Sequence, residues 1–235
     1  MDKLYIVMPA YNEEANIEEV VSSWYKVLSE CGQEGSKLVV ADSGSKDRTH
    51  EILLDLKKKH PNIEILEDTI TTHGPKLIAM YNYAISDGAD YVFQTDSDGQ
   101  TNPLEFKKFW DLRGKYDVLI GKRRVREDGF SRKIVEVVLC MILFAIFGVR
   151  VPDSNAPFRL MKSSVLKKYM PRFEEDYNLP NVMLTTFYAK YKENMNFLDI
   201  TFRPRQGGKN SLNIMKITKI GIKALSDFYG FKKSM

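Results

Sequence analysis

The stretch YVFQTDSDGQTNP, residues 91–103, decides how the chain folds and where its chemistry lies. It begins with β-favouring apolar residues and then places Asp96 and Asp98 one residue apart, ahead of glycine, glutamine and proline. An apolar run that ends in turn-forming residues is typical of a buried strand. Two carboxylates this close repel each other unless a positive group lies between them. The stretch therefore predicts a strand whose carboxyl end carries a divalent metal or a basic side chain.

Strand-like and helix-like segments alternate on either side of this stretch, over the first 122 residues. Strands are expected at 4–9, 37–41, 62–67, 91–96 and 116–121, and helices at 12–30, 46–61, 75–89 and 103–115. Pro75 suits the start of the third helix and Gly88 suits its end. Alternation at these lengths indicates βαβ units. We therefore expect the α/β class, with a mostly parallel central sheet flanked by helices.

The rhythm changes after residue 122. A basic stretch at 122–133 leads into further expected helices at 134–148, 163–170, 180–192 and 212–228, with strands at 157–161 and 196–204. The chain contains no linker, internal repeat or low-complexity segment. These features predict one domain over residues 1–235, in which the second half completes a site that the first half begins.

Composition narrows the class of protein only modestly. Lysines and arginines number 35 against 31 acidic residues, and a net charge of +4 weakly favours an anionic ligand or surface. Cys31 and Cys140 have neither zinc-site nor disulfide-framework spacing. The opening MDKLYIVMPAYNEE turns polar too soon for a signal peptide, so a cytoplasmic protein is expected.

One apolar run, VVLCMILFAIFGV at 137–149, needs separate interpretation. Its thirteen residues are too few for a membrane-spanning helix, which needs about 20. Such a run favours a buried core helix, and the alternative is a helix at a membrane interface.

Polar clusters end three of the expected strands: PAYNEE at 9–14, ADSGSKD at 41–47 and TDSDGQ at 95–100. Turn chemistry alone favours such residues, but ligands of parallel α/β sheets bind at the carboxyl ends of strands, so three clusters indicate a site. No glycine-rich phosphate loop follows the first strand, so the phosphates of a bound nucleotide would need a cation.

Asp96 and Asp98 can supply that cation by holding Mg²⁺ or Mn²⁺. A calcium EF-hand does not fit, because Gly99 stands at loop position 4 and Lys107 at position 12. The local alternative is an Asx turn that caps the helix at 102–103.

Taken in order, the motifs resemble the family 2 glycosyltransferases with a GT-A fold. The resemblance is greatest to the polyprenyl-phosphate glycosyltransferases, the group of dolichol-phosphate mannose synthase. The matching pieces are MPAYNEE at 8–14, VVADSGSKDRT at 39–49, TDSDGQTNP at 95–103, IGKRR at 120–124, VPDSNAPFRLM at 151–161 and FRPRQGGKNS at 202–211.

The resemblance implies a metal-dependent, inverting transfer of a hexose from a UDP- or GDP-linked sugar, with polyprenyl phosphate as the favoured acceptor. Residues 1–122 would form the nucleotide-binding half and 123–235 the acceptor-side half. Two alternatives stay open: transfer to a sugar hydroxyl during polysaccharide or O-antigen synthesis, and a non-catalytic nucleotide-binding protein.

The resemblance also implies roles for individual residues. The residues that bind the donor nucleotide would be Pro9, Ala10, Tyr11, Glu13, Asp42, Lys76, Asp96, Ser97 and Gln100. The metal would lie on Asp96 and Asp98, and the catalytic residues would be Asp98, Asp153, Arg123 and Arg205. Arg132 and Lys209 are weaker candidates for the acceptor phosphate. Ser43 departs from the commoner DDGS pattern, and Pro75 interrupts the Gly-Lys pair that often precedes the position of Lys76.

The acceptor decides whether the reaction needs a base. A lipid phosphate is largely ionised at neutral pH and needs cations, for which arginine is well suited, whereas a hydroxyl needs a general base. Asp153 and the acids at 174–176 (Glu174, Glu175 and Asp176) are candidates for that base. Asn181 stands in a helix where many relatives carry an acid, which leaves the acceptor class open.

Two segments suit peripheral contact with the inner face of the cytoplasmic membrane. One is the apolar helix at 134–148, which often lies at the membrane in the group that the chain resembles. The other is the helix at 212–228, where Lys216, Lys219 and Lys223 repeat beside apolar residues. A basic amphipathic helix fits an anionic membrane, although a solvated face of a core helix gives the same pattern. No nucleic-acid partner is expected.

Overall fold

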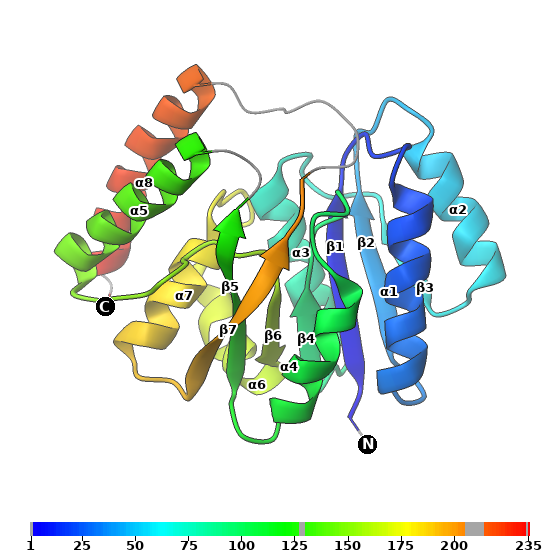
Figure 1. Cartoon of the computed structure of the whole chain (residues 1–235). Helices are drawn as coiled ribbons and strands as arrows, with labels where there is room; N and C mark the ends of the chain where they lie inside the picture. The colour runs from blue at the N-terminus through cyan, green and yellow to red at the C-terminus, as the bar shows by residue number, and fades with distance from the viewer. Residues whose placement is uncertain (1, 127–129, 205–213, 234) are drawn as a thin grey trace.

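The computed structural model describes residues 2–126, 130–204, 214–233 and 235, and no side chain within 124–132 or 205–222 is described. A seven-stranded sheet in the order β3-β2-β1-β4-β6-β5-β7 forms its centre (Figure 1). The strands are β1 (Leu4–Ala10), β2 (Lys37–Asp42), β3 (Ile63–Leu66), β4 (Tyr91–Gln94), β5 (Val118–Arg126), β6 (Arg159–Lys162) and β7 (Met195–Phe202).

Strand direction brings most of the sheet's carboxyl ends to one edge. β6 pairs antiparallel with β4 and β5, and all other neighbours pair parallel. Two reversals in succession return β5 and β7 to the direction of β1, β2 and β4. The mostly parallel sheet is confirmed, and the ends of six strands and the start of β6 share one edge.

Helices cover both faces of the sheet (Figure 1). One face carries α1 (Ile17–Cys31), α2 (Thr49–Lys59), the short η1 (Pro103–Glu105) and α4 (Phe106–Leu112). The other carries α3 (His73–Ser86), α6 (Ser163–Tyr169), η2 (Met170–Arg172) and α7 (Pro180–Lys190). Beyond α7, α5 (Phe130–Phe147) and α8 (Ile214–Lys233) lie side by side.

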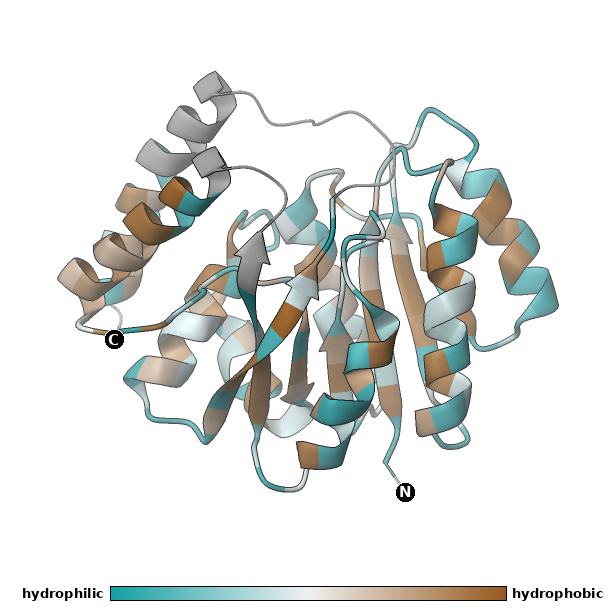
Figure 2. Ribbon diagram, viewed as in Figure 1, coloured by the Kyte–Doolittle hydropathy of each residue, from teal (hydrophilic) through white to brown (hydrophobic). Residues whose placement is uncertain are grey.

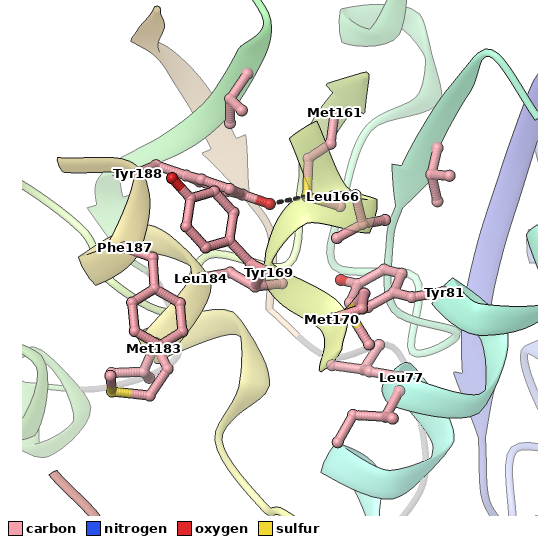
Figure 3. Packing of buried hydrophobic residues seen from close by; sticks show 14 of the residues in the cluster. Leu77, Tyr81, Met161, Leu166, Tyr169, Met170, Met183, Leu184, Phe187 and Tyr188 are labelled. Carbon is pink, nitrogen blue, oxygen red and sulfur yellow. Dashed lines mark hydrogen bonds between the residues drawn. The ribbon is translucent and has the colours of Figure 1, made fainter. Parts of the chain in front are cut away.

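Each strand contributes to two cores because successive side chains point to opposite faces. In β1, Ile6 belongs to the cluster that includes side chains of α1 and α2, whereas Tyr5 and Val7 belong to the cluster that includes side chains of α3. The strands are accordingly apolar along most of their length (Figure 2). On the second face Tyr81 from α3, Met161 from β6 and Tyr188 from α7 belong to one buried cluster (Figure 3).

Two boundaries differ from expectation in ways that matter for the site. α1 begins at Ile17 rather than residue 12, because the residues between form a loop in which Asn12 has a φ of 54°. β5 continues to Arg126, past the strand end expected at residue 121 and into the basic stretch. Its extension pairs with β7, with a register shift between Arg123 and Val125, and carries Arg123 to the carboxyl edge.

The apolar helix α5 is mostly exposed, so the expected core helix is wrong for most of its length. Only Leu143, Ile146 and Phe147 are buried among its described side chains. Its large exposed apolar side chains are Ile134, Val135, Val137, Val138, Met141 and Phe144. Among the described residues, no helix has the length and apolar content needed to cross a bilayer.

Candidate active site

Lys76 ties together the carboxyl ends of β1 and β2. It lies in the first turn of α3, is 1% exposed, and donates through Nζ to the carbonyl oxygens of Ala10 (2.6 Å) and Ser43 (3.1 Å). Burial lowers the pKa of this lysine, and the charge of Asp42 partly opposes that shift. Nζ also lies 5.5 Å from the centre of the Tyr11 ring, which is 43% exposed. Lys76 therefore joins the ends of β1 and β2 from the buried side, while the Tyr11 ring stays partly exposed.

Asp42, at the end of β2, is buried and held on both oxygens. The Ser45 hydroxyl donates to Oδ1, and the Nδ1 atom of His50 lies 3.2 Å from Oδ2. The neighbouring loop is fastened to α2, because the backbone N–H of Glu13 donates to the Thr49 hydroxyl at 2.8 Å. A fixed carboxylate at this edge can accept hydrogen bonds from the N–H groups of a nucleobase.

The acidic pair follows β4 and is positioned by short local hydrogen bonds. Ser97, between the two acids, donates to the carbonyl of Pro9 at 2.8 Å and so fixes the turn against the end of β1. Asp96 Oδ1 accepts from Gln94 Nε2 at 3.2 Å, and Asp98 Oδ1 accepts from the backbone N–H of Gln100 at 3.1 Å. The local Asx interaction is therefore present at Asp98, while Asn102 caps the following turn through the N–H of Leu104.

Electrostatics at this turn favour a bound cation. Burial and then the charge of Asp98 raise the pKa of Asp96 well above its usual range, although Arg123 and Arg159 act against that rise. Among the described residues, no three His, Cys, Asp or Glu side chains converge to enclose a metal. Two carboxylates suit Mg²⁺ or Mn²⁺, because these ions keep coordination positions for the oxygens of a phosphate-bearing ligand. The residues present therefore fit the metal that the resemblance implies.

Arg123, Asp153 and Glu136 form a buried ion cluster beside the acidic pair. Arg123 donates through Nε to Asp153 Oδ2 at 2.7 Å and through Nη2 to Asp153 Oδ1 at 2.8 Å. Its Nη2 also lies 3.2 Å from Glu136 Oε2, and Glu136 accepts from the backbone N–H of Ser154 at 2.8 Å. Burial and then the charge of Asp153 raise the pKa of Glu136. The cluster links α5, which carries Glu136, to the carboxyl edge of the sheet.

Gln100 closes the site toward β7. Its Nε2 donates to the Arg203 carbonyl at 2.8 Å, and its own carbonyl accepts from the Arg203 N–H at 2.9 Å. The next expected residues, Arg205 and Lys209, lie outside the described residues, as does the side chain of Arg132. The acids at 174–176 are exposed in the loop before α7, with no contact to the acidic pair among the hydrogen bonds described.

A family model for glycosyl transferase family 2 matches residues 5–170. The chain belongs to this family. A relative from Pectobacterium carotovorum, an undecaprenyl-phosphate 4-deoxy-4-formamido-L-arabinose transferase, is 24% identical over 221 residues that cover 92% of this chain. The chain spans 64% of that relative's length. A UDP-N-acetylglucosamine–dolichyl-phosphate N-acetylglucosaminyltransferase of Methanococcus voltae is 28% identical over 187 residues, which are 71% of this chain and 72% of the relative.

Solved structures agree on the fold of this family 2 glycosyltransferase. The glucosyl-3-phosphoglycerate synthase of Mycobacterium tuberculosis, in complex with Mn²⁺, UDP and phosphoglyceric acid, superposes with a TM-score of 0.69 at 16% identity. The match covers 97% of this chain and 78% of that one. TarS of S. aureus in complex with UDP-GlcNAc gives a TM-score of 0.63 at 19% identity, over 96% of this chain and 66% of that one. The GT-A fold expected from the sequence is confirmed.

Sequence reasoning missed three residues that shape the site of this family 2 glycosyltransferase: Gln94, Glu136 and Arg159. Gln94 ends the apolar strand β4, Glu136 lies within the apolar run of α5, and Arg159 begins β6 directly after apolar residues 156–158. Buried polar groups are costly unless they are paired, so their presence in such runs was a signal. The partners could not be foreseen, because they lie far away in the sequence.

Proposed function

We propose that this family 2 glycosyltransferase moves a hexose from a UDP- or GDP-linked sugar to a polyprenyl phosphate, with inversion and with Mg²⁺ or Mn²⁺ on Asp96 and Asp98. The proposal depends above all on one observation: a carboxylate pair lies at the same sheet edge as Asp42 and Tyr11. Relatives named for transfer to undecaprenyl and dolichyl phosphate support the acceptor, and the Mn²⁺ and UDP of a structural neighbour support the donor side.

On the donor side, Asp42 would accept hydrogen bonds from the base, and the exposed ring of Tyr11 would lie against the nucleoside. Pro9, Ala10 and Ser97 build the floor that joins the β1 and β4 ends. A bound divalent cation would stabilise the negative charge that develops on the departing diphosphate. The role of Asp96 and Asp98 is to hold that charge-stabilising group in a fixed place.

On the acceptor side, the ion cluster favours a phosphate over a hydroxyl. Both carboxylate oxygens of Asp153 already accept hydrogen bonds from Arg123, an arrangement suited to orienting a guanidinium rather than to removing a proton. An ionised phosphate attacks without a base and needs only cations to hold it. Arg123 is the described cation that we propose for this task, with Asp153 and Glu136 as its supports.

The surroundings of this cluster suit a lipid acceptor. A pocket of about 390 Å³ opens between α5 and the segment before Asp153, and its lining is mostly apolar: Glu136, Val137, Cys140, Met141, Phe144, Arg150, Val151 and Pro152. Val137, Met141 and Phe144 also belong to the exposed apolar face of α5. A chain of apolar carbons could lie in this pocket with its phosphate toward Arg123, which supports peripheral membrane contact through α5.

The test is a product assay with purified protein, polyprenyl phosphate in detergent and a panel of UDP- and GDP-sugars, with MnCl₂ or with EDTA. The expected product is a hexosyl polyprenyl phosphate that forms with Mn²⁺ and not with EDTA. Asp98→Asn should abolish it, whereas Asp111→Asn, which changes an exposed acid on α4, should not. A hexose recovered only on sugar-hydroxyl acceptors would overturn the acceptor. Full turnover after both Asp96 and Asp98 become asparagine would overturn the metal site.

A further inference from the structure

We infer that Gln94 and Asn181 are positioning residues, which hold the Asp96 carboxylate in the orientation that its cation requires. They do so through a buried line of hydrogen bonds that begins at Tyr81 of α3 and crosses α7 and β4. The inference rests on the proposed function, because it assumes that Asp96 binds a divalent metal.

The line consists of three successive hydrogen bonds. The Tyr81 hydroxyl donates to Asn181 Oδ1 at 2.8 Å, Asn181 Nδ2 donates to Gln94 Oε1 at 3.1 Å, and Gln94 Nε2 donates to Asp96 Oδ1 at 3.2 Å. Tyr81 and Gln94 are 0% exposed and Asn181 is 2% exposed. Water therefore cannot replace any of these partners without a rearrangement of the core.

The chemistry of an ionised Asp96 fixes the direction of the whole line. A carboxylate only accepts, so Gln94 must present its NH₂ group to Asp96 and its carbonyl oxygen to Asn181. Asn181 must then present its own NH₂ group to Gln94, which leaves its oxygen for the Tyr81 hydroxyl. The observed orientation of both amides agrees with this requirement. Each amide thus has one arrangement that satisfies both of its neighbours.

The backbone of Asn181 is held as firmly as its side chain. Its carbonyl accepts from Arg159 Nη1 at 3.1 Å and from the Thr185 hydroxyl at 2.8 Å. Arg159 stands opposite Gln94 in the β4–β6 register, and its Nε and Nη2 both donate to the Ala156 carbonyl. At the far end, Tyr81 belongs to the core between α3, α6 and α7, where its ring is drawn near Met170 and Leu77 (Figure 3).

The line ends on one oxygen of Asp96 and leaves the other available. Oδ1 accepts from Gln94, and Oδ2 has no hydrogen-bond partner among the described residues. A ligand held in this way presents Oδ2 in a reproducible place, as outer-shell partners do in characterised metal sites. The same volume filled with apolar side chains would support the fold without fixing the carboxylate.

Measured Mn²⁺ affinity separates positioning from packing. We would titrate MnCl₂ alone into the full chain and follow free Mn²⁺ by electron paramagnetic resonance, for the wild type, Gln94→Leu and Asn181→Asp. Loss of such an outer-shell bond typically weakens metal binding about 10- to 100-fold, and we expect both variants to fall in that range. Thr186→Val is the control, because Thr186 is equally buried on α7 and, in the described part of the chain, its hydroxyl donates to the Val182 carbonyl alone. Its Mn²⁺ affinity should equal that of the wild type.

Asn181→Asp gives the sharper test. The new carboxylate retains an acceptor for Tyr81 but forces Gln94 to turn its NH₂ group away from Asp96. Simple electrostatics predicts tighter Mn²⁺ binding from an added negative charge, whereas the positioning role predicts weaker binding. Unchanged or tighter binding in both Gln94→Leu and Asn181→Asp would overturn the inference. Wild-type protein that binds no Mn²⁺, or binds it equally well after Asp98→Asn, would instead overturn the proposed metal site and the inference with it.

Discussion

Replacement of Asp153 by asparagine should destabilise the protein measurably, because it removes one charge from a buried ion cluster. The side chains of Arg123 and Asp153 are 7% and 4% exposed, and two bonds of 2.7 and 2.8 Å join them. Loss of one partner from a buried pair costs about 3–5 kcal/mol. Here asparagine keeps one acceptor, and Glu136 remains 3.2 Å from the guanidinium, so we expect about 2 kcal/mol. For a chain of this size that corresponds to a fall in Tm of about 4–8 °C.

Urea and thermal unfolding of Asp153→Asn, Arg123→Met and Glu136→Gln would check the magnitude and its origin. Arg123→Met should cost the most, since it leaves two buried carboxylates without their shared cation. Glu136→Gln should cost the least, because burial already raises the pKa of Glu136 and so favours its neutral form. Asp111→Asn, whose carboxylate is 57% exposed beside Lys107, should lose less than about 1 kcal/mol. If Asp153→Asn is as stable as this control, or if Glu136→Gln is the most damaging, the reasoning about the cluster is wrong.

Three further predictions concern other parts of the chain. Gly74→Ala should lower the free energy of unfolding in urea by about 1–3 kcal/mol, because the new Cβ would lie 2.4 Å from the Tyr177 carbonyl oxygen and 2.5 Å from Asn178 backbone atoms. Wild-type stability would show that the backbone at Tyr177 and Asn178 can move to accommodate the methyl group. Hydrogen bonds from Lys37 and Tyr5 hold the pKa of Asp87 below its usual range. The ionised Asp87 therefore stabilises the folded protein fully above the unfolded pKa of about 4, and this stabilisation is lost as the pH falls through the lower folded pKa. Asp87→Asn should therefore flatten the acid limb of the unfolding free energy below about pH 4, by less than about 1 kcal/mol because the carboxylate is 38% exposed, and an unchanged limb would exclude this group. Replacement of Val137, Met141 and Phe144 by serine should weaken co-sedimentation with anionic vesicles at least about tenfold, since each side chain can bury apolar area in a bilayer. The control Leu104→Ser, which changes an 87% exposed leucine on η1, should not weaken it. Equal losses in both proteins would show that α5 is not the contact surface.

Local sequence patterns predicted the sheet and the place of the acidic pair, but not what surrounds them. Hydrophobic periodicity and turn residues are properties of short segments. Over the first 122 residues they were therefore enough to predict the βαβ order and to place Asp96 and Asp98 at a strand end. The pairing of Arg123 with Asp153 depends on how β5, β6 and the segment between them are arranged, and the pairing of Gln94 with Asn181 spans 87 residues. No pattern within one segment carries such information.

The apolar run at 137–149 shows a second limit of sequence reasoning. Apolar composition says that a surface avoids water, but not whether protein or lipid covers it. Which of the two covers the helix depends on tertiary structure, and here only the last turns of α5 pack on the core. The single acid among the preceding apolar residues, Glu136, is the residue that joins α5 to the site.

The distribution of charge at the carboxyl edge supports the proposed place of a divalent cation at Asp96 and Asp98. Among the residues that the structure describes, three buried or nearly buried cations lie near this edge, and each already has hydrogen-bond partners. Lys76 and Arg159 donate hydrogen bonds to backbone carbonyl oxygens, and Arg123 forms ion pairs with the carboxylates of Asp153 and Glu136. Asp153 and Glu136 thereby have a partner of opposite charge, whereas Asp96 is bonded only to a neutral amide and has a raised pKa. Because the nearby charge of Asp98 contributes to that raised pKa, a cation bound beside Asp96 would relieve repulsion between the two carboxylates.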